Sequence, residues 1–217
     1  MTILDGPRAE ATSGEAKSLV ILLHGYGADG NDLIGLAGPL GGALADTAFV
    51  SPNAPEPCTV NPMGRQWFPI SYLDGSTEAE MRAGAERAAV ALDAFIDAEI
   101  ERSGLPASRI ALMGFSQGTM MALHVGLRRA DALAGIVGFS GRLIEPERLA
   151  DDIRSRPPVL LIHGTADEVV PFESMEQAQT GLGEAGVSVE TVARPGLGHG
   201  IDERGMVAAA QFLMQRL

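Results

Sequence analysis

Residues 110–118, Ile-Ala-Leu-Met-Gly-Phe-Ser-Gln-Gly, constrain the fold of this chain more than any other stretch. An apolar run leads into a G-x-S-x-G pattern with Ser116 at its centre, and a second apolar run follows over residues 119–127. This order predicts a buried strand, a sharp turn and a buried helix. Gly114 and Gly118 suit such a turn because the strand and the helix leave no room for a Cβ there. The pattern therefore predicts a nucleophile elbow, with Ser116 lifted above a sheet at the positive end of a helix.

The chain has 27 glycines, so the alternative is a glycine-rich turn that carries an ordinary serine. The rest of the sequence decides between the two. Strand patterns occur at 18–23, 48–50, 133–139, 159–163 and 187–192, and helix patterns at 31–44, 77–103, 146–152, 172–185 and 202–217. Strands that alternate with helices predict an α/β fold with a mostly parallel sheet and helices on both faces.

Length and composition limit the remaining choices. A chain of 217 residues with 46% hydrophobic content suits one domain over 1–217, in which the polar segment 1–17 adds an edge strand or a hairpin. No stretch approaches the roughly 20 apolar residues of a membrane span, which indicates a cytoplasmic protein without stable membrane insertion. The net charge of −12 argues against nucleic acid as a partner. The single cysteine, Cys58, excludes an internal disulfide, and no nucleotide or zinc motif is present, so we expect no cofactor and no metal.

Polar residues collect where the predicted strands end. His24, Ser116, Ser140, His163, Asp167 and His199 all lie at or just after the carboxyl end of a strand. In parallel sheets these ends share one edge, and functional sites lie there. We therefore expect these residues to lie along one edge of the sheet.

Four histidines compete for the role of a base beside Ser116. His124 lies within the helix after the elbow, which predicts a hydrogen-bonded core histidine. His24 and His163 each precede a glycine at a strand end, which favours hydrogen bonds to neighbouring loops. His199 lies in a loop between two glycines that would let an imidazole reach the serine, so we assign the base to His199.

An acid and two oxyanion donors complete the predicted machinery. Asp167 follows the strand before His199, and its alternative role is that of a helix cap or turn residue. The order Ser116, Asp167, His199 is the nucleophile–acid–base order of a known hydrolase arrangement. The backbone N–H groups of Gln117 and Tyr26 are the candidate oxyanion donors.

Residues 51–76 form a predicted long irregular loop with five prolines. It carries the only tryptophan, Trp67, beside Phe68. These aromatic residues either seal the core beneath the loop or line an apolar substrate pocket. For the substrate-binding alternative, the candidate residues are Trp67, Phe68, Met63, Val169 and Leu197.

Several motifs together resemble the phospholipase/carboxylesterase family. They are Leu-Leu-His-Gly-Tyr-Gly-Ala-Asp at 22–29, Pro-Asn-Ala-Pro at 52–55, Trp-Phe at 67–68, Gly-Phe-Ser-Gln-Gly at 114–118, His-Gly-Thr-Ala-Asp-Glu-Val-Val-Pro at 163–171 and Gly-His at 198–199. The resemblance implies an α/β-hydrolase fold, a Ser116–Asp167–His199 triad and oxyanion donors at Tyr26 and Gln117. The chain departs from the family at Tyr26, where leucine is frequent, and at Thr119, where a second glycine is frequent.

The expected function is that of a serine carboxylesterase. It would cleave esters of short to medium acyl chains through an acyl-enzyme intermediate, without a lid domain, because only residues 142–156 separate two strands where many hydrolases insert one. An acyl-protein thioesterase or lysophospholipase is the alternative, followed by a serine peptidase and a binding protein without catalysis. The expected partner is a small-molecule ester or thioester. Exposed apolar loops and the family resemblance favour a homodimer without fixing the oligomeric state.

Overall fold

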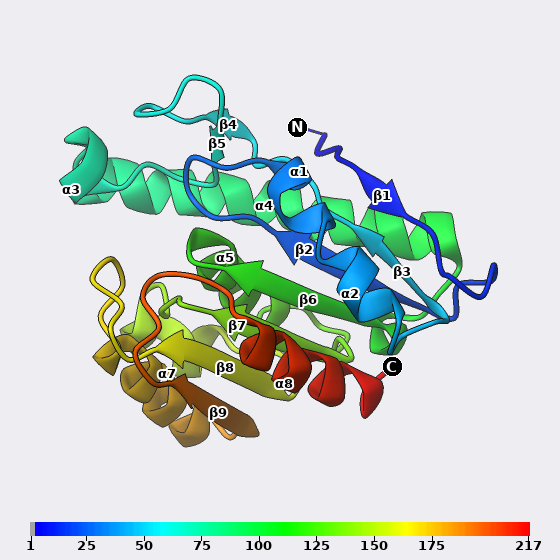
Figure 1. The fold of residues 1–217 in the computed structure, drawn as a ribbon. Helices are drawn as coiled ribbons and strands as arrows, with labels where there is room; N and C mark the ends of the chain where they lie inside the picture. The colour runs from blue at the N-terminus through cyan, green and yellow to red at the C-terminus, as the bar shows by residue number, and fades with distance from the viewer. Residues whose placement is uncertain (1–2) are drawn as a thin grey trace.

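A seven-stranded sheet lies at the centre of the computed structural model, which describes residues 3–217 (Figure 1). The strands are β1 (Arg8–Ala9), β2 (Ser18–Leu23), β3 (Thr47–Val50), β6 (Ile110–Phe115), β7 (Gly135–Phe139), β8 (Val159–Gly164) and β9 (Val189–Arg194). Their order across the sheet is β1-β3-β2-β6-β7-β8-β9. Only β1 runs antiparallel, along the outer edge of β3. The predicted mostly parallel sheet is confirmed, and the polar N-terminal segment contributes an edge strand.

Helices cover both faces of this sheet. One face carries α4 (Glu78–Ser103), α5 (Gln117–Gly126) and α7 (Glu173–Glu184), and the other carries α1 (Gly30–Ile34), α2 (Ala37–Gly41) and α8 (Glu203–Met214). Alternate residues of β2 enter the two cores, with Ile21 on the α4–α5 side and Val20 on the α8 side. This alternation is the period of a strand buried on both faces.

Local signals set several helix ends as predicted. Thr77 and Glu80 form a capping box at the start of α4, and Gly104 ends that helix in the left-handed conformation. The Asp202 carboxylate accepts from the Gly205 N–H and caps α8.

The prediction of one helix over 31–44 is wrong. The structure has two short helices, α1 and α2, and the first is capped by Asp29. Pro39 explains the break, because it has no N–H to bond to the carbonyl of Gly35, four residues earlier.

The prediction of an irregular loop over 51–76 is also wrong in part. This segment contains a short hairpin, β4 (Glu56–Pro57) and β5 (Arg65–Gln66), followed by α3 (Ser71–Asp74). The hairpin is bonded to the turn after β2, because the Gly27 N–H donates to the Arg65 carbonyl and the Arg65 N–H donates to the Ala28 carbonyl. Residues 51–76 and the turn after β2 are therefore one connected layer over the carboxyl edge of the sheet.

Three further short helices lie between strands: η1 (Ala107–Arg109) before β6, and η2 (Pro146–Arg148) and α6 (Leu149–Asp152) between β7 and β8. The segment between β7 and β8 is thus no larger than the sequence predicts. Across residues 3–217, no helix combines the length and the apolar character needed to cross a membrane.

Candidate active site

Ser116 lies at a strained turn between β6 and α5. Its φ of 53° and ψ of −116° are unusual for a residue with a side chain. Its N–H donates to the Phe139 carbonyl at 2.8 Å. A Cβ on Gly114 would lie 2.4 Å from the Gly118 backbone, and a Cβ on Gly118 would lie 1.8 Å from the Leu23 carbonyl oxygen. The backbone therefore has the predicted geometry of an elbow, and both glycines are required by close contacts.

Asp167 and His199 form a hydrogen-bonded pair beside the elbow. The distance from His199 Nδ1 to Asp167 Oδ2 is 2.8 Å, and the Asp167 side chain is fully buried. The His199 ring packs against the Phe115 ring with centroids 4.9 Å apart, next to Ser116 in sequence. The His199 loop lies directly on the end of β8, because a Cβ on Gly164 would lie 2.2 Å from the Leu197 carbonyl oxygen.

The environment of Asp167 favours the ionised carboxylate. Its Oδ1 accepts from the N–H groups of Val169 and Val170, both at 2.9 Å. Burial by itself would raise the pKa of Asp167, but the hydrogen bonds from His199 and from these two N–H groups outweigh it and hold that pKa below its usual value. A charged Asp167 fixes His199 with Nδ1 protonated and Nε2 free.

Two further histidines anchor loops, as the sequence predicts. His24 Nε2 accepts from the Ala54 N–H at 3.0 Å, so its Nδ1 donates to the Gly25 carbonyl at 2.8 Å. Burial lowers the pKa of His24 and keeps it neutral. His163 Nε2 donates to the Val170 carbonyl at 2.9 Å.

His124 is buried in α5, where the sequence places it, but the prediction that it is hydrogen-bonded is wrong. Its Nδ1 has no hydrogen-bond partner among residues 3–217. Burial lowers the pKa of His124 to about 4.

The backbone N–H groups of Tyr26 and Gln117 both lie beside the elbow. A Cβ on Gly25 would lie 3.5 Å from the Ser116 Cβ, which places the turn holding Tyr26 next to the serine. Gln117 is the first residue of α5, where an N–H has no acceptor within the helix. The Tyr26 hydroxyl donates to Asp74 Oδ2 at 3.3 Å. Burial, Cys58 and Asp74 raise the Tyr26 pKa, which keeps this hydroxyl protonated.

The Gln117 side chain has a role that the sequence did not reveal. Its Oε1 accepts from the Trp67 N–H at 2.8 Å, and its Nε2 donates to the Phe68 carbonyl at 2.7 Å. The side chain is completely buried. Gln117 therefore fastens residues 51–76 to the elbow. No local pattern announces such a contact, because its partners are about 50 residues away.

Thr119, the second departure from the family pattern, lies beneath the serine. Its Oγ1 is 2.8 Å from both the Gly114 and the Phe139 carbonyl oxygens. A Cβ added to Gly138 would lie 2.5 Å from the Thr119 side chain, and one added to Gly141 would lie 2.4 Å from it. Thr119 thus bridges β6 and β7 in a space that exists because both neighbours are glycines.

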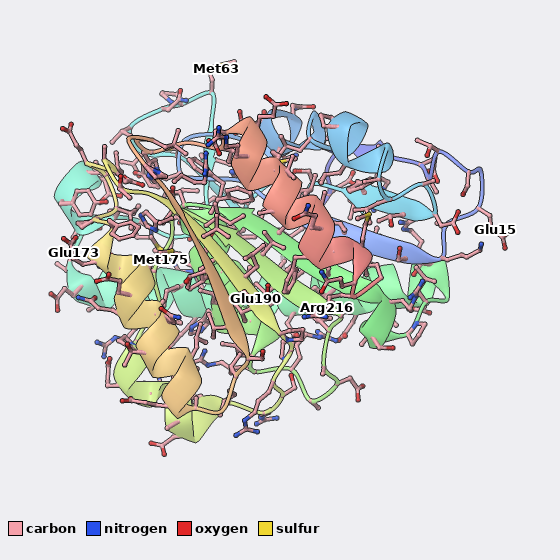
Figure 2. The ribbon with its side chains drawn as sticks, turned by 60° about the horizontal axis from the view of Figure 1, so that its bottom comes forward. Glu15, Met63, Glu173, Met175, Glu190 and Arg216 are labelled. Atoms are coloured by element: carbon pink, nitrogen blue, oxygen red, sulfur yellow. The ribbon has the colours of Figure 1, made fainter. Side chains whose placement is uncertain are left out.

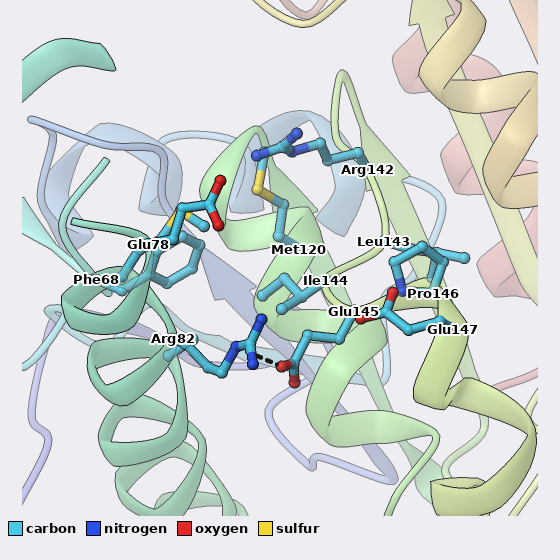
Figure 3. Close-up of a pocket in the computed structure, with 12 residues that line it drawn as sticks. Phe68, Glu78, Arg82, Met120, Arg142, Leu143, Ile144, Glu145, Pro146 and Glu147 are labelled. Atoms are coloured by element: carbon cyan, nitrogen blue, oxygen red, sulfur yellow. Dashed lines mark ion pairs between the residues drawn. The ribbon is translucent and has the colours of Figure 1, made fainter. Parts of the chain in front are cut away.

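A cavity of about 260 Å³ adjoins the elbow (Figure 3). Two of its lining residues lie next to the Ser116 backbone. The Met120 N–H donates to the Ser116 carbonyl. Arg142 directly follows Gly141, and a Cβ added to Gly141 would lie 3.0 Å from the same carbonyl oxygen. The cavity is lined by Phe68, Glu78, Met81, Arg82, Ala85, Met120, Arg142, Leu143, Ile144, Glu145, Pro146 and Glu147.

The predicted substrate-binding residues separate in the structure. Phe68 lines the cavity. Trp67 does not, and the interpretation of Trp67 as a pocket wall is wrong: the side chain is fully buried, and its indole N–H donates to the His24 carbonyl at 2.9 Å. Met63 is 89% exposed near the tip of the β4–β5 loop and points away from the rest of the molecule (Figure 2). Val169 and Leu197 flank Asp167 and His199 outside this cavity and remain predictions. Within residues 3–217, no group of three or more His, Cys, Asp or Glu side chains is arranged to hold a metal ion.

Comparisons with known proteins agree with this geometry. Residues 4–217 match the model of the phospholipase/carboxylesterase family. The structure is similar to the crystal structure of esterase PE8, with a TM-score of 0.94 and 46% identity over 99% of this chain and 100% of that one. Acyl-protein thioesterase 1 of Neurospora crassa is 33% identical over 80% of this chain and 76% of its own length. A probable carboxylesterase of Oryza sativa subsp. japonica is 33% identical over 95% of this chain and 80% of its own length.

Proposed function

The chain belongs to the phospholipase/carboxylesterase family and hydrolyses carboxylic esters, and we propose that Ser116, Asp167 and His199 are its catalytic triad. One observation carries this proposal: His199 is bonded to a buried, ionised Asp167 at 2.8 Å while its ring packs on the residue before the strained Ser116. This pairing supports the assignment of acid and base for acyl transfer, with the candidate nucleophile next to the residue on which the base packs.

The proposed mechanism has two steps. His199 Nε2 takes the proton of Ser116 as Oγ attacks the ester carbonyl, and the N–H groups of Tyr26 and Gln117 stabilise the oxyanion. His199 then protonates the departing alkoxide, which leaves an acyl-enzyme. Water, deprotonated by the same imidazole, attacks that acyl group. The bond from the acyl carbon to Ser116 Oγ then breaks, His199 returns the proton to Oγ, and the acid is released. Asp167 keeps His199 oriented throughout and stabilises the imidazolium.

We assign the acyl chain to the cavity of about 260 Å³ beside Met120 and Phe68. Its lining is mixed: apolar side chains such as Phe68, Met120 and Ile144 suit a hydrocarbon chain, and charged side chains lie among them. Its modest size suits short to medium chains. The similarity to an acyl-protein thioesterase favours thioester cleavage as the second candidate function.

Active-site labelling tests the triad. Purified protein should be labelled by a fluorophosphonate at Ser116 and should release p-nitrophenol from p-nitrophenyl acetate, and Ser116→Ala should abolish the label. The same variant should lower kcat on the order of 10⁶-fold. Retained labelling in Ser116→Ala would refute the assignment of the nucleophile.

A substrate panel separates the candidate functions. We expect the highest kcat/KM among p-nitrophenyl acetate, butyrate and dodecanoate for one of the two shorter esters. A preference for palmitoyl-CoA would instead indicate the thioesterase, and a preference for lysophosphatidylcholine would indicate the lysophospholipase.

A cytoplasmic location and a homodimer are further parts of this proposal. The one cysteine, Cys58, is free and buried, which is compatible with a reducing compartment. Cell fractionation tests the location. Light scattering across a concentration series tests the dimer, and a constant monomer mass would contradict it.

A further inference from the structure

An ion pair crosses the cavity beside the elbow. Arg82 of α4 and Glu145, which precedes η2, are joined by a 2.8 Å contact between Nε and Oε1 (Figure 3). The Glu145 side chain is only 9% exposed, whereas that of Arg82 is 58% exposed. The pair therefore joins a buried carboxylate on one wall to a cation that reaches in from solvent on the other.

Glu145 is held in place by more than this contact. Its φ of 47° lies in the left-handed region, which is costly for a residue with a Cβ. Its second oxygen, Oε2, lies 3.3 Å from Nη1 of Arg148. The Glu145 carboxylate therefore lies between two cationic partners at the wall of the cavity.

The pair lies away from the end of the cavity nearest the serine. Met120 and Arg142 adjoin the Ser116 backbone, and the chain then runs from Arg142 along the cavity to Glu145. In Figure 3, Met120 and Arg142 lie at one end and the pair lies at the other. We propose that the Arg82–Glu145 ion pair is the end wall of the acyl site and limits the length of the acyl chain. This proposal rests on the assignment of the acyl chain to this cavity.

The physical reason is the cost of passing the pair. A longer chain would have to separate the two side chains and set its methylene groups against the buried Glu145 carboxylate. A buried charge that loses a partner is strongly destabilised, and an apolar chain supplies no hydrogen bond in return. Short chains end before the pair and avoid that cost.

Chain-length profiles test the proposal. The experiment measures kcat/KM on p-nitrophenyl butyrate and dodecanoate for wild type, Arg82→Ala, Glu145→Ala and Arg82→Lys. We expect the dodecanoate-to-butyrate ratio to rise about tenfold or more in the two alanine variants. Arg82→Lys should keep the wild-type ratio, because it keeps the cation. Arg148→Ala is the matched control: it removes the other partner of Glu145 from outside the cavity and should leave the ratio unchanged.

The outcomes are distinct. An unchanged ratio in an active Arg82→Ala protein would overturn the proposal, and Arg82 is exposed enough for this variant to fold. The proposal would also be overturned if the alanine variants changed kcat/KM on esters that differ in the length of the alcohol and left it unchanged on esters that differ in the length of the acyl group. Failure of the proposed triad would appear differently, as ester hydrolysis that persists in Ser116→Ala.

Discussion

On one side of the site, residues 110–118 hold Ser116 by backbone contacts that leave no space for an added methyl group. On the other side, residues 51–76 reach the elbow through Trp67 and Phe68, directly after a hairpin whose tip carries the exposed Met63. The two sides meet at the Gln117 side chain. This difference suggests that the chemistry depends on the tightly packed side, whereas substrate choice depends on side chains that line the cavity and the loops.

Asp167→Asn should have a large effect on catalysis, second to that of Ser116→Ala. An amide would leave His199 in the wrong tautomer, so we expect kcat to fall about 10⁴-fold while the fold is retained. Steady-state kinetics with p-nitrophenyl acetate measure the fall. Glu168→Gln, at the exposed neighbour, is the control and should change kcat little.

The same substitution has a signature in the pH dependence of stability. The pKa of Asp167 is lower in the folded protein than in the unfolded chain, so its contribution is complete above the unfolded value and is lost as the pH falls below it. Asp167→Asn should therefore lose less unfolding free energy than wild type between neutral and strongly acid pH. Urea denaturation at several pH values measures this, and parallel pH profiles would contradict it.

Gly118→Ala should destabilise the tightly packed side by a steric clash within the fold. The new Cβ would lie 1.8 Å from the Leu23 carbonyl oxygen, so the helix and strand must separate. We expect a loss of about 4 kcal/mol or more in unfolding free energy. Gly183→Ala in α7 is the control, because nothing lies within 4 Å of its added Cβ. Equal stability of the two variants would contradict the steric account of the elbow.

Gln117→Ala should weaken the connection between the two sides. It keeps the backbone N–H of residue 117 but leaves the Trp67 N–H and the Phe68 carbonyl buried without partners. Each such group costs about 1–3 kcal/mol, so we expect the two together to lower the unfolding free energy by on the order of 2–6 kcal/mol. Thermal and chemical denaturation measure it, with Gln177→Ala on the exposed face of α7 as control. Stability equal to wild type would show that this side chain does not fasten the loop.

The tightly packed side is also the side that sequence predicts well. Gly114 and Gly118 carry information about the turn because the constraint acts within a few residues. The carboxyl-end rule for parallel strands then brings Asp167 and His199 together, because it depends only on the strand pattern. Pairing of His24 and His163 with neighbouring loops follows from the same rule.

The side formed by residues 51–76 is predicted poorly for a physical reason. Trp67 is a core residue because its indole N–H meets the His24 carbonyl, a contact between segments 43 residues apart. The hairpin likewise depends on bonds from Arg65 to the turn after β2. Neither contact leaves a periodic pattern in the sequence, so the pocket wall and the core could not be distinguished from composition alone.

Met63→Ser, at the tip of the hairpin, should have the smallest effect on stability and on kcat/KM. Because the side chain is 89% exposed and outside the cavity, we expect unfolding free energy to change by no more than about 0.5 kcal/mol. On the same ground kcat/KM for p-nitrophenyl butyrate should stay within about twofold of wild type. Phe68→Ala is the comparison within the same segment: it removes a buried ring from the cavity wall and should cost about 3 kcal/mol or more in stability. A tenfold fall in kcat/KM for Met63→Ser would show that the hairpin tip folds over the substrate during the reaction. Residues 51–76 would then contribute to substrate binding as far as Met63.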